Sequence, residues 1–333
     1  MKFADMPQGA ILLVDKVEGW TSHDVVAKSR RALGTKKVGH AGTLDPMATG
    51  LLVLGAGPAT RLLTYLVGLD KTYTTTIRLG LSTVTDDREG DITATAPAGL
   101  VAEVFADQDR ITAGVANLTG PIEQAPSSVS AIRVDGKRAY DRVRAGEEVV
   151  LKKRPVTIHG FDIGEPRILS VPGPDGEPVE VIDIDAVVRC TTGTYIRALA
   201  RDLGEALGVG GHLTALRRTA VGPFSVDAAT PHARLVGDGT EAGDPGRLYS
   251  PADIARTLFP VLELGADEAK DLADGKRLNI DPDRHAPAPL VAAILPGGDG
   301  GSGSDRLVGL VVIKGGRTHI LTNFPSQQPG GAA

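Results

Sequence analysis

Glycine and proline interrupt this sequence throughout, and this limits how far any helix or strand can extend. The 333 residues include 42 glycines and 22 prolines, whereas only 4% are aromatic. Proline does not continue a helix interior or a central strand, and glycine favours turns. The pattern therefore favours many short elements over a helical bundle, and we expect an α+β protein with a mixed sheet.

Apolar segments between the turns predict both strands and helices. Runs rich in β-branched residues predict strands over five ranges: 10–15, 71–79, 129–134, 156–163 and 181–190. Helical spacing predicts three helices: 22–33, 101–118 and 196–207. Thr21 or Ser22 is a suitable N-cap for the first helix, and Gly34 and Gly208 are stop signals after the first and last. A hairpin-like turn at 173–178 precedes the last strand.

Two domains are expected from the length and from a change in composition. We place a large domain at residues 1–233, a linker rich in Gly and Asp at 234–249, and a small β-rich domain at 250–333. Within the small domain, a Pro-rich and then Gly/Ser-rich segment around 281–305 predicts a flexible loop.

Charge is unevenly distributed along the chain. The formal net charge is −5, yet residues 227–306 carry 14 acidic and 8 basic side chains, which leaves about +1 for the remainder. Two segments of that remainder are basic: 28–37 has five cations and no anion, and 133–154 has eight cations and four anions. Such segments can bind RNA phosphates, or they can be ordinary solvated faces.

Cysteine content and hydropathy indicate the cellular environment expected for the chain. Cys190 is the single cysteine, so no intramolecular disulfide and no structural zinc site is expected, which fits a reducing cytoplasm. The N-terminus has no charged leader before a long apolar run, and no segment approaches roughly 18 consecutive apolar residues. We expect a soluble cytoplasmic protein without membrane association, and a monomer, because no long exposed apolar face is evident.

The segment from Gly39 to Pro46 places an imidazole, His40, and a carboxylate, Asp45, among residues that favour tight turns. A carboxylate in such a segment can be held rigidly. The alternative is that Asp45 starts a helix, because Asp followed by Pro is a common N-cap and first-turn pair. His40 can equally be satisfied by turn carbonyls, and no partner at ligand spacing indicates a metal.

A second segment, Cys190 to Gly204, is expected to run from a strand end through a glycine turn into a helix. It places Tyr195 and Arg197 at the junction, where side chains commonly face a cleft. An arginine there can orient a carboxylate by a charge-assisted hydrogen bond. An exposed ion pair with Asp202 explains Arg197 equally well.

Aromatic and glycine-rich segments add two further hypotheses. Tyr73, on the strand expected at 71–79, can present its ring to an unstacked base, although a buried core tyrosine is the commoner explanation. The segment Gly55 to Thr60 imitates a dinucleotide-binding loop, but Thr60 replaces its third glycine and Pro58 interrupts the turn. A nicotinamide or flavin site is therefore not expected.

Together and in this order, these segments resemble the TruB family of bacterial tRNA pseudouridine synthases over roughly residues 10–225. The matching motifs are Asp15-Lys16, Gly19 to Val26, Lys37 to Gly50, Asp70 to Tyr73, Leu79-Gly80, Thr83, Thr85, Asp87, Gly90, Pro126 to Ile132, Gly136 to Tyr140, Arg154 to Val156, Gly193 to Arg197, Asp202 to Gly204 and Leu216 to Arg218. Val17 departs from the family, which has proline there, and Pro126, preceded by Gln124-Ala125, stands where the family often has a pair of prolines.

The resemblance implies a fold and an activity. It implies the pseudouridine synthase fold, a mixed, largely antiparallel sheet with flanking helices, followed by a small β-rich C-terminal domain that only loosely resembles the PUA domain. It implies an enzyme that flips the T-loop uridine, position 55 of tRNA, out of its stack and isomerises it to pseudouridine, with no cofactor and no metal. The T arm of tRNA is the implied partner, with no obligate protein partner.

The resemblance also assigns roles to individual residues. It makes Asp45 the catalytic aspartate, pairs Arg197 with it, and stacks Tyr73 on the target base. It implies that His40 helps to fill the space vacated in the RNA loop. The remaining implied residues contact substrate: Tyr195 and Leu216 line the pocket, and Arg217 and Arg218 are candidates for phosphate contacts.

The residues themselves allow this chemistry and leave alternatives open. Isomerising uridine breaks the bond from N1 to C1′ and rejoins the base through C5, which requires a positioned carboxylate and a closed pocket. Attack on the sugar, addition to the base and loss of a 2′ proton all remain open as routes. The chain can instead be an RNA-binding or tRNA-folding protein, or a pseudouridine synthase for another RNA.

Overall fold

The described residues form two compact units, which are considered separately. The computed structural model describes residues 2–126, 133–134, 137–138, 152–237, 243–281, 283–298 and 304–324. Unit 1 consists of residues 1–45, 51–67 and 223–333, and unit 2 of residues 46–50 and 68–222. The chain therefore passes between the units four times, once at the bond from Asp45 to Pro46.

Unit 1 combines the N-terminal strands with the C-terminal sheet. Its elements in chain order are η1 (Phe3–Asp5), β1 (Ala10–Lys16), α1 (Ser22–Leu33), β2 (Val38–His40), β3 (Thr49–Ala56, from residue 51), η2 (Gly57–Leu62), α2 (Leu63–Val67), β14 (Phe224–Ser225), η3 (Val226–Ala228), β15 (Thr230–Pro231), α7 (His232–Val236), β16 (Leu248–Tyr249), α8 (Pro251–Leu258), β17 (Val261–Glu263), α9 (Ala266–Ala273), β18 (Ala288–Leu295), β19 (Arg306–Lys314) and β20 (Arg317–Asn323).

The N-terminal strands of unit 1 are buried, and local signals define the helix beside them. Strand β1 lies between β15 and β3, and β2 pairs antiparallel with β3. Helix α1 begins with a capping box, in which Thr21 Oγ1 accepts from Asp24 N at 3.1 Å and Asp24 Oδ2 accepts from Thr21 N at 2.9 Å. It ends at Gly34, which has a φ of 65°. The predicted limits of this helix are confirmed.

The C-terminal part of unit 1 is a four-stranded sheet in the order β17-β18-β19-β20, which confirms the predicted β-rich character. The flexible loop predicted around 281–305 is wrong for Ala288–Leu295, which form strand β18. Val291 to Ile294 are completely buried in this strand. Pro-rich and Gly-rich residues on both sides of this apolar segment led to the loop prediction. The strand is buried because it pairs with β17 on one side and β19 on the other.

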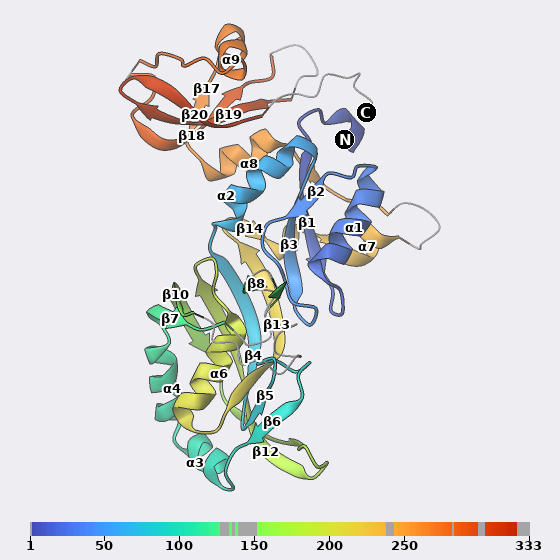
Figure 1. The fold of residues 1–333 in the computed structure, drawn as a ribbon, viewed down its shortest axis with the longest axis vertical. Coiled ribbons are helices and arrows are strands. Elements are labelled where there is room, and N and C mark those ends of the chain that lie inside the picture. Colours follow the sequence, from blue (N-terminus) through green and yellow to red (C-terminus); the bar gives the residue numbers. More distant parts are fainter. Residues whose placement is uncertain are drawn as a thin grey trace. The chain divides into compact units, whose positions relative to one another are not determined.

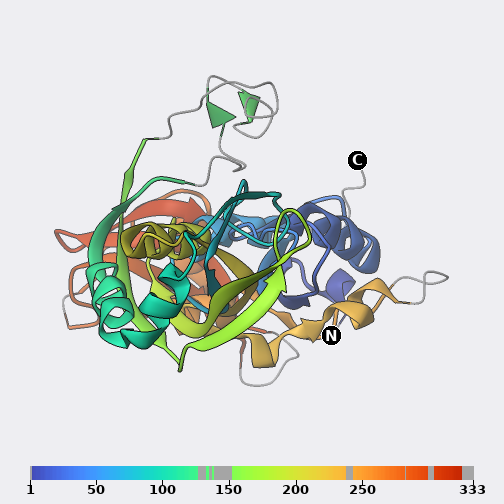
Figure 2. The ribbon, with the colours of Figure 1, turned by 90° about the horizontal axis from the view of Figure 1, so that it is seen from below.

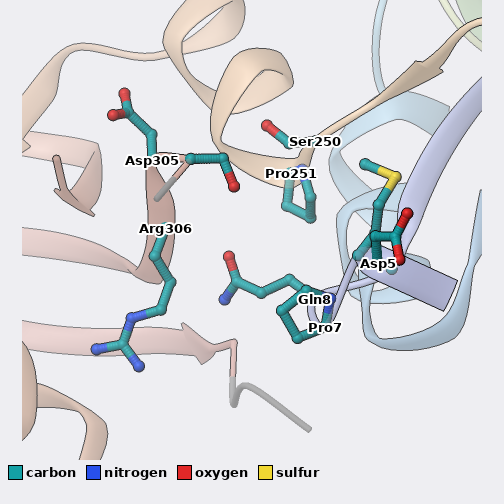
Figure 3. Close-up of a pocket in the computed structure, with 10 residues that line it drawn as sticks. Asp5, Pro7, Gln8, Ser250, Pro251, Asp305 and Arg306 are labelled. Carbon is teal, nitrogen blue, oxygen red and sulfur yellow. The ribbon is translucent and has the colours of Figure 1, made fainter. Parts of the chain in front are cut away.

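Gln8 attaches the N-terminal segment of unit 1 to the C-terminal sheet. Its side-chain amide donates to Leu307 O at 2.6 Å and to Phe324 O at 3.0 Å, and its Oε1 accepts from Leu307 N at 3.0 Å. Figure 3 shows this side chain extending toward the strand that begins at Arg306, beside a pocket lined by segments 5–9, 250–251 and 304–306. Gln8 is only 6% exposed, so its hydrogen bonds replace water in a buried contact.

Unit 2 is a sheet with helices packed against it. Its elements in chain order are the first two residues of β3, β4 (Lys71–Leu79), β5 (Leu81–Thr83), β6 (Ile92–Thr95), α3 (Leu100–Ala106), α4 (Gln108–Asn117), β7 (Gly120–Gln124), β8 (Arg133–Val134), β9 (Lys137–Arg138), β10 (Arg154–Ile163), β11 (Arg167–Pro172), β12 (Pro178–Cys190), α6 (Ile196–Leu207) and β13 (Gly211–Val221).

Strand β4 is at the centre of the unit 2 sheet. It pairs antiparallel with β12 on one edge and with β13 on the other, and β12 continues to β10 and β7. At the edge of β13, Thr49 and Gly50 pair in parallel with Arg217 and Arg218. Helices α3, α4 and α6 lie together against this sheet (Figures 1 and 2). The mixed, largely antiparallel sheet with flanking helices confirms the predicted fold class.

Two features of unit 2 differ from the sequence predictions. The helix predicted at 101–118 is two helices, because Asp107 adopts a non-helical conformation that ends α3 and precedes α4. Strand β11 was not predicted, and it pairs with the first half of β12 across the turn at 173–178. Most of the strand predicted at 129–134 and of the basic segment 133–154 lies outside the described residues.

Helix α6 has the limits that the sequence predicts, Ile196–Leu207, and ends at Gly208 with a φ of 78°. No helix among the described residues is both long enough and apolar enough to cross a membrane.

Replacing Gln8 by alanine should destabilise unit 1. The substitution leaves buried backbone groups of Leu307 and Phe324 without their partners, so we expect unfolding free energy to fall by about 2–4 kcal/mol. Urea unfolding measures this. The matched control is Gln108→Ala on the exposed surface of α4, which should stay within about 0.5 kcal/mol of the wild type. Equal effects of the two substitutions would contradict the docking role of Gln8.

Candidate active site

Asp45 lies in a non-helical connection at the end of its segment of unit 1. Strand β2 ends at His40, the next residues form bends and irregular backbone, and β3 begins at Thr49. The alternative in which Asp45 caps a helix is therefore wrong, because no helix follows it. Asp45 is half-buried.

Helix α1 anchors the backbone beside Asp45. Ser22 Oγ accepts from Leu44 N at 2.9 Å and donates to Leu44 O at 3.2 Å. Ser22 is 1% exposed and Leu44 is 4% exposed, so both groups are shielded from water. A buried pair of hydrogen bonds at the preceding residue restricts the backbone from which the Asp45 carboxylate projects.

One explanation from the sequence places His40 in a turn. In the structure it is the last residue of strand β2. It faces His23 of α1, with ring centroids 5.8 Å apart and an angle of 80° between the ring planes. His40 is half-buried, whereas His23 is exposed.

In unit 2, the structure brings Tyr73 and the segment 216–218 together on adjacent strands. Tyr73 of β4 is opposite Arg218 of β13 and opposite Val188 of β12. Its side chain is 9% exposed, as expected for a residue of a central strand. Leu216 and Arg218 are buried, whereas Arg217 is half-buried and donates to Thr49 Oγ1 at 3.4 Å.

Gly50 is required where β3 meets β13. Its φ is 98°, and a Cβ atom at this position would lie 2.2 Å from Arg218 O. No other residue type fits so close an approach of two backbones. The four residues after Asp45 thus lead to a position that only glycine can occupy.

Tyr195 is held by its backbone at the start of α6. Tyr195 N donates to Gln124 Oε1 at 3.0 Å, and Gln124 Nε2 donates to Tyr195 O at 3.2 Å. Gln124 is 1% exposed. This reciprocal pair satisfies the backbone where the chain turns from Gly193, with a φ of 84°, into the helix.

Arg197 forms a buried ion pair with Asp87. Its Nη1 lies 3.3 Å from Asp87 Oδ2 and donates to Thr85 O at 2.6 Å. The side chains are 8% and 4% exposed. The alternative of an exposed pair with Asp202 is wrong, because Asp202 pairs with Arg201 at 2.7 Å.

The carboxylate of Asp87 is fixed by its own loop. It accepts from Thr85 Oγ1 at 2.5 Å and from Glu89 N at 3.0 Å. The preceding Asp86 has a φ of 57°, unusual for a residue with a side chain, and its carboxylate pairs with Arg201 at 3.0 Å. Two adjacent acids of one loop therefore bind two arginines of one helix.

Sequence reasoning did not include Asp87 and Gln124 among the site residues. Asp87 lies in a motif that matched the family, and two adjacent acids in a loop were a further signal. Gln124 gave no comparable signal, because its role depends on a pairing with a residue on a distant element. Among the described residues, no group of three or more His, Cys, Asp or Glu side chains is arranged to hold a metal ion.

Burial shifts the pKa of two side chains on the strands close to Tyr73. Burial raises the pKa of the Cys190 thiol to about 11, so this thiol is protonated at neutral pH and is a poor nucleophile. Burial, together with the neighbouring Arg218 guanidinium, lowers the pKa of Lys71 to about 8. Lys71 is opposite Cys190 and donates from Nζ to Leu69 O at 2.5 Å.

Two family models match the chain. The model of the TruB family pseudouridylate synthase, N-terminal domain, matches residues 30–196, and that of the tRNA pseudouridylate synthase B C-terminal domain matches residues 197–236. Among curated relatives named tRNA pseudouridine synthase B, the protein of Arthrobacter sp. (strain FB24) is 51% identical over 327 residues, 96% of this chain and 98% of its own. That of Leifsonia xyli subsp. xyli (strain CTCB07) is 52% identical over 319 residues, 96% and 97%.

Solved structures share the fold at low identity. A chain in a crystal structure of a Cbf5-Nop10-Gar1 complex has a TM-score of 0.65 and 22% identity, covering 98% of this chain and 88% of that chain. A chain in a structure of an H/ACA RNP bound to a substrate RNA containing 2′-deoxyuridine has a TM-score of 0.63 and 22% identity, with 97% and 87% covered. With the family match, this likeness confirms the expected pseudouridine synthase fold.

Replacing Asp87 by asparagine should destabilise unit 2. The substitution removes the charge of Asp87 from its buried ion pair with Arg197, and we expect unfolding free energy to fall by about 3 kcal/mol in urea unfolding. The matched control is Asp185→Asn, which breaks the exposed pair with Arg167 and should cost less than about 1 kcal/mol. A smaller loss for Asp87→Asn than for the control would refute the structural role of the buried pair.

Stability should depend on pH through Lys71. Its pKa of about 8 in the folded chain lies below its ordinary value of 10.5, so between these pH values the unfolded state binds more protons. Folding is then favoured increasingly as pH rises through this window, and the full penalty of the buried ammonium applies below it. In urea unfolding, wild type should gain stability relative to Lys71→Met from pH 8 to pH 10. A constant difference would contradict the assignment.

Proposed function

The chain belongs to the TruB family of pseudouridylate synthases, and from this premise we propose that it isomerises the T-loop uridine of tRNA to pseudouridine. The observation that carries the proposal is about 50% identity, over nearly the whole chain, to relatives named tRNA pseudouridine synthase B. The T-loop position follows from the motif around His40 and Asp45, which resembles that of the family.

Asp45 is the proposed catalytic carboxylate. The reaction breaks the glycosidic bond and rejoins the same base through C5, so it adds and removes no atoms overall. It requires a carboxylate that keeps its position while the base rotates. The two hydrogen bonds between Ser22 and Leu44 support this role, because they restrain the residue next to Asp45.

Arg197 and Tyr73 are proposed to act on the same uridine. A guanidinium keeps a carboxylate ionised and oriented, and an aromatic ring stacks on a base that has left its helix. The buried pair of Arg197 with Asp87 supports a fixed position for this guanidinium. Unstacking the base costs on the order of a few kcal/mol, which such stacking offsets.

The other predicted site residues are proposed to contact the RNA around that uridine. His40 helps to fill the space left in the T loop, and Tyr195 and Leu216 line the pocket. Arg217 is the better candidate of the two arginines for a phosphate contact, because Arg218 is buried. We further propose that residues 1–233 carry the reaction without a cofactor, that residues 250–333 form the smaller domain, and that the protein acts as a monomer.

The test is turnover of an unmodified T-arm hairpin by purified protein in EDTA, with pseudouridine read by mass spectrometry after nuclease digestion. Wild type should convert only the T-loop uridine. Asp45→Asn should lose at least roughly 10³-fold in turnover while still binding the hairpin. Asp175→Asn, on the exposed turn at 173–178, is the matched control and should retain wild-type turnover.

Other outcomes would count against the proposal. Binding without turnover by the wild type indicates an RNA-binding protein or an enzyme for another RNA. Conversion by Asp45→Asn at the wild-type rate would remove Asp45 from the mechanism.

A further inference from the structure

His23 is an exposed aromatic side chain that the proposed reaction does not use. It lies in the first turn of α1, and its ring meets that of His40 in an edge-to-face arrangement at 5.8 Å and 80°. Such a geometry is favourable between aromatic rings. Because His23 is exposed and His40 half-buried, the pair presents His23 to solvent.

The backbone of His23 is fixed with respect to the segment that precedes Asp45. On one side of it, Thr21 and Asp24 complete the capping box of α1. On the other, its neighbour Ser22 forms both hydrogen bonds to Leu44. The His23 ring is therefore carried on a rigid turn of unit 1, not on a mobile loop.

One cation lies on the same face of α1, and two more immediately precede β2. His23, Ala27 and Arg30 share a face because they are four and seven residues apart, and Arg30 lies about 10 Å along the helix from His23. Arg30 Nη2 donates to Val38 O at 3.3 Å, so this face lies beside β2 (Figure 1). Lys36 and Lys37, which lead into β2, are exposed.

This surface, the α1–β2 strip, consists of His23, Arg30, Lys36, Lys37 and His40. Residues 28–37 contain five cations and no anion. The nearest acid in sequence to His23 is Asp24, whose carboxylate accepts the two hydrogen bonds from Thr21 that close the cap. An exposed aromatic ring next to several cations can bind a chain with a negatively charged backbone and exposed aromatic bases.

We propose that the α1–β2 strip binds an unpaired stretch of the RNA substrate, with a base stacked on His23 and phosphates at Arg30, Lys36 and Lys37. Unpaired RNA is recognised by stacking on aromatic side chains, histidine included, and its backbone by cations. The proposal rests on the proposed function in that the RNA is the same tRNA arm. It adds a contact made by α1, at a residue separate from the groups assigned to the reaction.

The experiment measures the Kd of an unmodified T-arm hairpin by fluorescence anisotropy, beside turnover of the same hairpin. His23→Ala should raise Kd and KM roughly tenfold, as expected for loss of one stacked base, while kcat changes less than twofold. His23→Tyr keeps a flat ring and should restore binding to within about threefold of wild type. His285→Ala, at a half-buried histidine of the C-terminal part outside the strip, is the control and should bind as wild type.

A second variant tests the cations independently. In the double variant Lys36→Gln, Lys37→Gln, the slope of log Kd against log salt should decrease by about 1 to 2 in magnitude. An unchanged slope, or a Kd for His23→Ala within twofold of wild type, would overturn the proposal that the α1–β2 strip binds RNA. So would equal losses in His23→Ala and His23→Tyr, because stacking would then not be the interaction.

The outcomes separate this inference from the proposed function. If wild type converts the uridine but His23→Ala binds normally, the strip is overturned and the function is retained. If wild type binds without converting, and His23→Ala weakens binding, the strip is retained and the function is overturned. Absence of hairpin binding by the wild type would overturn both.

Discussion

Strand β4 is paired along its whole length on both edges, and unit 2 depends on this double pairing. At one end Leu79 is opposite Ile182 and Gly211, and at the other Lys71 is opposite Cys190 and Val221. Because a slip of one residue would reverse every side chain between the two faces, pairing on two edges holds the register strongly. Tyr73 on β4 and the segment 216–218 on β13 take their relative positions from this register.

Buried charge provides the second constraint on unit 2. Asp86 and Asp87, in the loop between β5 and β6, pair with Arg201 and Arg197 of α6. Removing charges from water is costly unless each is paired and hydrogen-bonded, and Thr85 and Glu89 complete the hydrogen bonds of Asp87. A loop and a helix that share such pairs have few alternative arrangements, which favours a fixed position for the start of α6. In unit 1, the uncharged pair of bonds between Ser22 and Leu44 has the same effect beside Asp45.

The sequence predictions succeeded where the determining interactions are local. Both α1 and α6 have the predicted limits, because a capping box or a glycine in the left-handed conformation acts within a few residues. They failed where the partner is distant. The sequence places β18 in a loop, although it is a strand whose burial depends on β17 and β19, and it does not predict β11, which pairs with β12. For Asp45 and Arg197, the simpler structural explanations were also wrong, because no helix follows Asp45 and Asp202 binds Arg201 instead.

The sequence by itself determined the family, the α+β class, the limits of α1 and α6, and the motifs that carry Asp45, Tyr73 and Arg197, because spacing and turn chemistry depend on neighbouring residues. Only the tertiary structure decided which groups those motifs contact. The pairing of Arg197 with Asp87, of Tyr195 with Gln124 and of His23 with His40 each joins segments that are separate in the chain. Such contacts follow from strand register and helix packing, which depend on the whole fold and not on any one segment.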